Sequence, residues 1–384
     1  MLTPHGKQLF PLDEHAVYLD HGGYGVSPKE VLTARIEALL KIEKAPGPFF
    51  AFDCRPAWKD IAASVARRLS VRAEDLALVD NVTDGINAVL RSLAFEPNDQ
   101  ILITSVTYGA IANAARYIAG RHGAHVTEVA LPFPNPDPSR CVDAIRAALS
   151  PRTKLAILDH ITSATALVLP IAEMSRVCRE HGVAVLIDGA HAPGNVALDI
   201  PSIGADWYAA NLHKWCFVPR GCGFLWAARD RQKGLVPNVL SWDIDKPFPH
   251  SFGWTGTRDS SAWLSIPSAF AFMDRLGPDE ILRHNHTLVR EGIRLLAQAW
   301  KVDANTPDSM IGSMALTPLP RGLPFPATTE GCGKLQKTLW ESHKIMASPS
   351  FVHDSRIWLR VSAQIYNQID DYQKLAETIV NLAA

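Results

Sequence analysis

The sequence has few cysteines, and none of them form a recognisable motif. Six cysteines are scattered over 384 residues, with no CxxC pair and no histidines beside them at zinc-ligand spacing. This pattern argues against a structural metal site or a disulfide framework and favours buried, reduced thiols. We therefore expect no metal.

Long apolar runs and an excess of charge are also missing. No window reaches the roughly 18 consecutive apolar residues of a membrane span, and residues 1–14 lack the features of a secretion signal. The 38 Lys and Arg nearly balance the 39 Asp and Glu, so nothing favours a nucleic acid or a membrane surface as partner. We expect a cytoplasmic protein with a small-molecule ligand.

What the chain does contain is a repeated alternation of strand and helix patterns. Between residues 76 and 226, short apolar runs alternate with segments of helical periodicity. This predicts an α/β fold with a mostly parallel, doubly wound sheet and ligand groups at the carboxyl ends of the strands. Residues 45–52, which contain two prolines and three phenylalanines, are expected to be an irregular loop.

Two side chains suggest a cofactor. Asp188 ends a buried apolar strand, and Lys214 lies between a histidine and Trp215. Such an aspartate often only caps the next helix, and a single lysine is usually a surface charge. Together, however, a carboxylate that keeps a ring nitrogen protonated and an amine that holds an aldehyde are what a pyridoxal phosphate site needs. Burial in this aromatic setting would lower the pKa of Lys214 toward that of a usable nucleophile.

Other segments allow two interpretations each. Thr83 is expected to cap a helix whose free N–H groups either bind phosphate or are simply capped. Tyr108 either stacks on a ring or only packs, and the hydroxyls of residues 161–165 either bind a phenolate or turn the chain. Arg360, in an apolar strand, needs an anion from a ligand or from the protein. The glycines of residues 22–25 allow either a ligand or a tight turn.

The order and spacing of these segments resemble the class V aminotransferase and cysteine desulfurase family of fold-type-I pyridoxal phosphate enzymes, most of all its isopenicillin N epimerase-like branch. The resemblance rests on residues 81–84, 188–191, 213–214, 254–259, 360–362 and 366–367. It implies a large cofactor-binding domain over residues 16–265. A smaller C-terminal α+β domain would comprise residues 266–384 with residues 1–15.

The same resemblance implies roles for individual residues. Lys214 would form a Schiff base with pyridoxal 5'-phosphate and move the α-proton, Asp188 would pair with the ring nitrogen, and His191 would support the ring. Further implied cofactor contacts are Tyr108, Val82, Thr83, Asp84, Ser163, Asn211 and His213, with Thr255 and Thr257 reaching the phosphate of a neighbouring subunit in a homodimer. Arg360, Gly23 and Tyr24 would bind substrate.

The implied enzyme removes the α-proton of an amino acid or an amino-acid-containing substrate. Cysteine desulfurases carry a nucleophilic cysteine ahead of the carboxylate-binding arginine, but residues 345–351 contain none and Cys332 lies too far upstream. Persulfide formation is therefore not expected. Epimerisation is the outcome closest to the resemblance, and transamination and carbon–sulfur β-elimination stay open. A binding or regulatory protein with the same fold is the non-enzyme alternative, against which the intact Lys214 argues.

Overall fold

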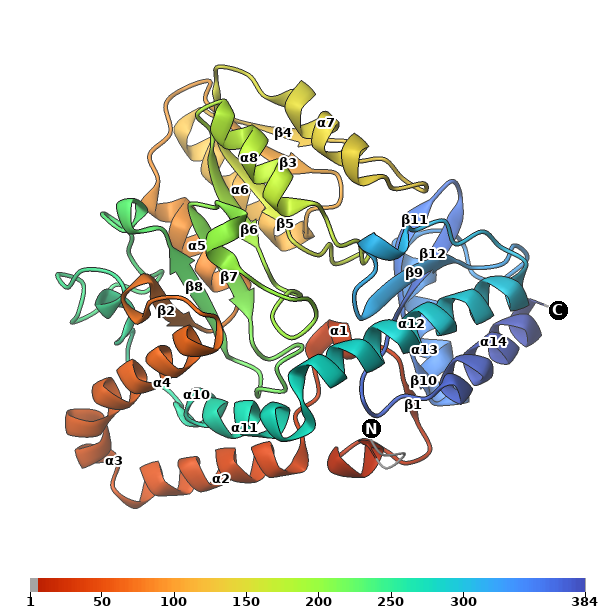
Figure 1. Ribbon diagram of the computed structural model, residues 1–384, viewed down its shortest axis with the longest axis horizontal. Coiled ribbons are helices and arrows are strands. Elements are labelled where there is room, and N and C mark those ends of the chain that lie inside the picture. Colours follow the sequence, from red (N-terminus) through yellow and green to blue (C-terminus); the bar gives the residue numbers. More distant parts are fainter. Residues whose placement is uncertain (1–5, 384) are drawn as a thin grey trace.

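The computed structural model describes residues 6–383, and a seven-stranded sheet forms the centre of its larger part (Figure 1). The strand order is β2-β8-β7-β6-β5-β3-β4. The bounds are β2 Leu76–Val79, β3 Gln100–Thr104, β4 His125–Val129, β5 Thr153–Asp159, β6 Ala184–Asp188, β7 Trp207–Asn211 and β8 Gly223–Ala227. Only β8 runs antiparallel to its neighbours β7 and β2 among these strands. The predicted mostly parallel α/β sheet is confirmed.

Helices connect and cover these strands because the strands other than the edge strand β4 are largely apolar on both faces and must be buried on both. The central residues of β3 and β6, Ile101–Ile103 and Val185–Ile187, are fully buried. The covering helices are α5 Val82–Ser92, α6 Gly109–His122, α7 Pro138–Ala148, α8 Ile171–Glu180 and α9 Ile200–Ile203. Short 3-10 turns occur at Gly6–Leu9, Ala73–Asp75, Arg229–Arg231, His250–Phe252 and Asp308–Met310.

The N-terminal part is more helical than expected. It contains α1 His21–Tyr24, α2 Lys29–Lys44, α3 Pro46–Pro48, a π-helical turn Phe49–Asp53 and α4 Cys54–Arg68. The prediction of an irregular loop over residues 45–52 was wrong. Pro46 begins α3, where a proline loses no hydrogen bond because the first N–H groups of a helix have no partner within it.

A smaller antiparallel sheet, with the order β11-β12-β9, lies at the other end of the molecule (Figure 1). Its bounds are β9 Met314–Pro318, β11 Ser348–His353 and β12 Arg356–Ser362, and β1 Val17–Tyr18 pairs nearby with β10 Ile345–Met346. The helices of this half are α12 Pro278–Trp300, α13 Thr329–His343 and α14 Ile369–Ala383. The preceding α10 Ser261–Leu264 and α11 Ile266–Leu276 pack in the larger hydrophobic cluster beside α2 and α4 (Figure 1). The N-terminal Val17 and Leu19 join the separate hydrophobic cluster of the smaller half. The domain division at residue 265 stays a prediction, and residues 1–5, assigned to the small domain, lie outside the described part.

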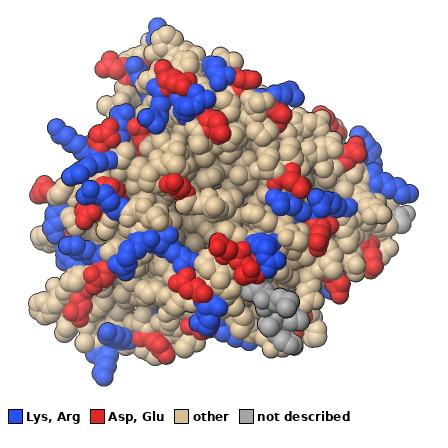
Figure 2. Space-filling view, viewed as in Figure 1, with Lys and Arg blue, Asp and Glu red and all other residues tan. Residues whose placement is uncertain are grey.

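The surface carries charges of both signs side by side over the face in Figure 2. Among residues 6–383, no helix has the length and apolarity required to cross a membrane. The same residues contain no cluster of three or more His, Cys, Asp or Glu that could hold a metal ion. All six cysteines are free and buried.

Candidate active site

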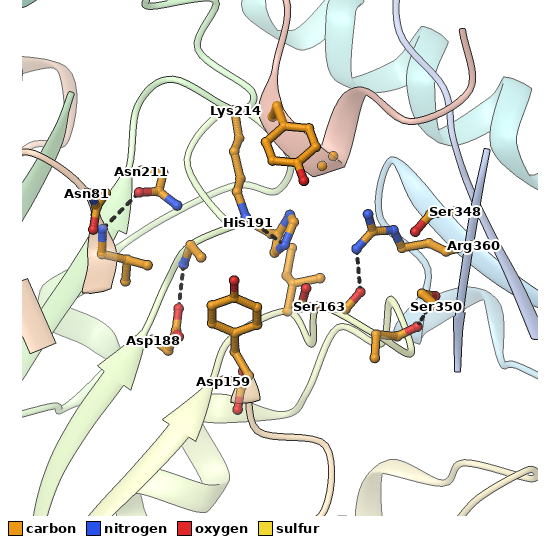
Figure 3. Close-up of a pocket in the computed structure, with 18 of the residues that line it drawn as sticks. Asn81, Asp159, Ser163, Asp188, His191, Asn211, Lys214, Ser348, Ser350 and Arg360 are labelled. Atoms are coloured by element: carbon orange, nitrogen blue, oxygen red, sulfur yellow. Dashed lines mark hydrogen bonds between the residues drawn. The ribbon is translucent and has the colours of Figure 1, made fainter. Parts of the chain in front are cut away.

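A cavity of about 630 Å³ opens at the carboxyl edge of the large sheet and reaches the small sheet (Figure 3). Asp159, Asp188 and Asn211 line it from the last residues of β5, β6 and β7. Parallel strands bring their carboxyl ends to one edge, so neighbouring strand ends supply neighbouring side chains. Arg360 enters from β12 of the small sheet, so the cavity draws residues from both halves of the chain.

Two buried carboxyl groups lie side by side at this edge. Asp159 and Asp188 are register partners on β5 and β6, both 2% exposed, and the Oδ2 atom of each has no hydrogen-bond partner. Burial raises the pKa of Asp188, and burial together with the charge of Asp188 raises that of Asp159 well above its usual range. An unpaired buried carboxylate oxygen is costly, so Asp188 is suited to accept an N–H from a ligand. Sequence reasoning missed Asp159, although it ends a strand just as Asp188 does.

Lys214 follows β7 and points into the same cavity as Asp188 (Figure 3). Its Nζ atom lies 3.0 Å from His191 Nε2. Burial, and then repulsion by Arg360, lowers the pKa of Lys214 to about 8. A substantial fraction of this amine is therefore neutral near physiological pH, which a nucleophile or a general base requires.

The glycine-rich turn before α2 packs tightly against the loop that carries Lys214. A Cβ atom on Gly25, whose φ is +69°, would lie 1.9 Å from the carbonyl oxygen of His213. His21 Nε2 lies 2.7 Å from the carbonyl oxygen of Lys214, and Tyr366 holds the other ring nitrogen at 2.9 Å. Gly25 thus serves close backbone packing, whereas Gly23 and Tyr24 line the cavity, and their contact with a substrate stays a prediction.

The N-terminus of α5 faces the cavity, but its cap differs from the prediction. Asn81, not Thr83, caps the helix, and its side chain accepts the N–H of Asp84 at 2.9 Å. The carboxylate of Asp84 accepts hydrogen bonds from Asn238 Nδ2 at 2.7 Å and from the Asp80 N–H at 3.2 Å. Thr83 lines the cavity and Asp84 does not, and the contact of the Asp84 backbone with a ligand phosphate stays a prediction.

Residues beyond β7 complete this end of the cavity. Asn211 Oδ1 accepts the N–H of Val82 at 2.9 Å, which ties the strand end to the start of α5. The ring of His213 lies 3.0 Å from the carbonyl oxygen of Cys222, and burial lowers the pKa of His213 to about 4. The Val82 N–H and the one ring proton of a neutral His213 are therefore already used within the protein. Thr83, at the start of α5, is the residue here that can still donate to an anion in the cavity.

Arg360 already has a protein anion. Its Nη2 donates to Asp20 Oδ1 at 2.8 Å and its Nη1 to the carbonyl oxygen of Ser163 at 2.6 Å, while its buried Nε has no partner. Both charged side chains are nearly inaccessible, at 6% for Arg360 and 4% for Asp20. The sequence allowed Arg360 to pair with a carboxylate of the protein but did not identify Asp20, which lies 340 residues earlier in the chain. Ser163 lines the cavity, as does the partly exposed Tyr108, and the stacking role of Tyr108 stays a prediction.

Two predicted cofactor contacts lie away from the main cavity, and several residues that line it were not predicted. Thr255 lines a different, small cavity and Thr257 is exposed, so neither reaches the main cavity of its own chain. The small domain adds residues that the sequence did not indicate: Gln336, Met346, Ser348 and Ser350. Ser348 pairs with Arg360 in the β11–β12 register, which places the two side chains next to each other.

Comparisons with known proteins agree with this geometry. Residues 17–316 match the family model described as Aminotransferase class-V. The chain is 33% identical to a putative L-cysteine desulfhydrase 2 of Oryza sativa subsp. japonica, over 97% of this chain and 85% of the relative. It is 31% identical to isopenicillin N epimerase of Streptomyces clavuligerus, over 97% and 96%. The solved structure of a cystine C-S lyase, C-DES, superposes with a TM-score of 0.84 at 21% identity, covering 97% of this chain and 99% of that one. The chain belongs to the class-V aminotransferase family.

Proposed function

We propose that this protein is a pyridoxal phosphate-dependent carbon–sulfur β-lyase that acts on L-cysteine or a close derivative. One observation carries the proposal: Lys214, Asp188 and Arg360 open onto one cavity (Figure 3). A nucleophilic amine, a buried carboxylate and a buried cation are the groups that an aldehyde, a pyridine nitrogen and a substrate carboxylate require.

The cavity residues fit the cofactor. The unpartnered Oδ2 of Asp188 would receive the ring N–H, Lys214 would bond to the aldehyde, and Thr83 with the N-terminus of α5 would hold the phosphate. His191, beside Lys214, would support the ring from the amine side. When bound, pyridoxal 5'-phosphate supplies a protonated ring that draws electron density from the α-carbon of the substrate.

The residues of the chain then perform the proton transfers. Arg360 fixes the substrate carboxylate, which brings the α-hydrogen to Lys214. Lys214 removes this proton as a general base. The electron pair of the C–H bond forms a Cα–Cβ double bond, the Cβ–S bond breaks, and the sulfur leaves with its electrons and takes the proton from Lys214. Water completes the balance, so that cysteine yields pyruvate, ammonia and hydrogen sulfide.

Two features favour release of sulfide over storage of sulfur on the protein. No cysteine is among the described residues that line the cavity, and the segment ahead of Arg360 is the paired strand β11 with Ser348 and Ser350 facing the cavity. Relatives at 31–33% identity include a putative and a probable L-cysteine desulfhydrase. We therefore propose that no enzyme-bound persulfide forms.

The proposal predicts equal molar amounts of sulfide and pyruvate from L-cysteine. Both products would be measured with the purified holoenzyme, and α-proton exchange and chirality would be followed by NMR and chiral chromatography in the same samples. Pyruvate without sulfide, or loss of the α-proton with inversion and no pyruvate, would contradict a lyase.

Epimerisation is the second candidate, and Tyr24 is the observation that favours it. Inversion needs a second acid besides Lys214, and the phenol of Tyr24 lines the cavity at 65% exposure. The 31% identity to isopenicillin N epimerase supports the same possibility. Inversion of an amino-acid substrate that is lost in Tyr24→Phe, while α-proton removal persists, would favour this reaction over elimination.

We further propose that two chains form a dimer through an apolar surface around α2 and residues 237–259. Ile36 and Leu40 of α2, with Leu240 and Trp242, are 57–86% exposed. Arg35 binds Asp259 at 3.3 Å, which joins α2 to the end of that segment. Exposed apolar side chains mark an interface where they lie together in one patch, and a partner bound there would bring Thr255 and Thr257 toward the neighbouring cavity.

This dimer predicts a mass in solution of twice the 42.0 kDa of one chain, measured by light scattering after size-exclusion chromatography. Trp242→Asp should weaken the dimer by at least about 2 kcal/mol, because a buried interface tryptophan would be lost. Tyr117→Asp, at a residue that is 65% exposed on α6, should leave the mass unchanged. A monomeric wild-type protein would contradict the dimer.

A further inference from the structure

Lys214 and Trp215 contact the same imidazole from opposite sides of its ring. Lys214 Nζ lies 3.0 Å from His191 Nε2, and Trp215 Nε1 lies 3.4 Å from His191 Nδ1. His191 is 1% exposed and Trp215 is fully buried, so water does not compete for these ring nitrogens. The segment that follows β7 thus supplies both the Lys214 amine and, through Trp215, a second contact to His191.

This arrangement fixes the position of one proton. An indole N–H can only donate a hydrogen bond, so His191 Nδ1 must accept it. A neutral imidazole carries a single ring proton, which must then be on Nε2. Burial, and then the nearby Lys214, lower the pKa of His191 well below its usual range, which keeps the ring neutral. The Nε2–H therefore faces Lys214 Nζ, which can accept it only as an unprotonated amine.

We propose that Trp215 is a positioning residue that holds His191 in the Nε2–H tautomer and thereby keeps Lys214 as a neutral amine. In the other tautomer, Nε2 would present a lone pair to Lys214 and stabilise the ammonium form instead. The other charged groups act in both directions, since Arg360 disfavours the ammonium while Asp188 and Asp20 favour it. Burial already favours the amine, and the Nε2–H tautomer of His191 acts in the same direction, whichever bond of the substrate the enzyme breaks.

The tautomer is measured directly by ¹⁵N NMR of the full-length protein, stripped of cofactor and labelled at histidine. Protonated and unprotonated ring nitrogens have well separated shifts, and the spectrum of His191→Gln assigns the signals of His191. We expect a proton on Nε2 and a bare Nδ1. A proton on Nδ1, or on both nitrogens, would overturn the proposal without any variant of Trp215 and without reference to the reaction.

Trp215→Phe tests the role of the indole N–H, because phenylalanine keeps an aromatic ring in the core but cannot donate. We expect part of the His191 population to move its proton to Nδ1. The apparent pKa for covalent attachment of added pyridoxal phosphate to Lys214, followed by absorbance over a pH series, should rise by about one unit above the wild-type value, a tenfold loss of neutral amine.

Trp300→Phe is the matched control. It removes another buried indole N–H, the one that donates to the carbonyl oxygen of Ala376 at 3.2 Å in the small domain. Its His191 tautomer and its attachment profile should equal those of the wild type. Wild-type values of both quantities in Trp215→Phe would show that Trp215 only packs. If Trp215→Phe does not fold, the tautomer of the wild-type protein decides the proposal alone.

Discussion

Lys214→Ala is expected to lower the rate of α-proton exchange of a bound amino acid by a factor on the order of 10⁴. Lys214 is the one lysine among the described residues that line the cavity, and it lies beside His191, so the variant loses both the covalent attachment of the cofactor and the general base. The rate would be measured as the loss of the α-proton signal in D₂O by proton NMR, with L-cysteine and L-alanine as substrates.

Two controls separate lost chemistry from lost folding. Lys154→Ala removes an exposed lysine at the start of β5 and should keep the wild-type rate. A small primary amine in the buffer should restore part of the rate in Lys214→Ala, because it replaces the missing base in the space that the side chain vacates. Exchange within tenfold of the wild type in Lys214→Ala would contradict the assignment of Lys214 as the base.

The sequence predicted the large sheet and the position of the site at its carboxyl edge because both follow from local patterns. Apolar runs alternating with helices determine a parallel sheet, and a parallel sheet brings Asp188 and Asn211 together at one edge. Lys214 could be singled out because its neighbours in the chain are aromatic and uncharged. The helix cap at Asn81 was missed because Asn81 and Thr83 are both good capping residues, and only the backbone geometry distinguishes them.

What the sequence did not reveal depends on contacts between distant segments. Asp20 meets Arg360 across 340 residues, and Ser348 faces the cavity only because β11 pairs with β12 in one register. The sequence also did not reveal that β8 is antiparallel, since an apolar strand has the same pattern in either direction. The contact of Trp215 with His191 lies within one local region, but it requires the ring orientations that only the fold provides.

Arg360→Gln is expected to destabilise the protein by about 3–5 kcal/mol, because it leaves the carboxylate of Asp20 buried without its cation. Asp20→Asn should cost a comparable amount, since Arg360 would lose its anion and keep only neutral acceptors, the new amide oxygen and the carbonyl oxygen of Ser163. The double variant should regain most of this loss, because two neutral amides can hydrogen-bond in the same space. Unfolding in urea measures all three, and losses that simply add would contradict a coupled buried pair.

The matched control is the exposed pair of Glu280 and Arg283 on α12, where the same exchange to glutamine should give a coupling below about 0.5 kcal/mol.

The double variant at Asp20 and Arg360 also separates stability from binding. A folded protein with two amides has lost the cation that the substrate carboxylate requires, so its KM for L-cysteine should rise on the order of 100-fold. A stable double variant with an unchanged KM would show that Arg360 supports the fold and that another group binds the carboxylate.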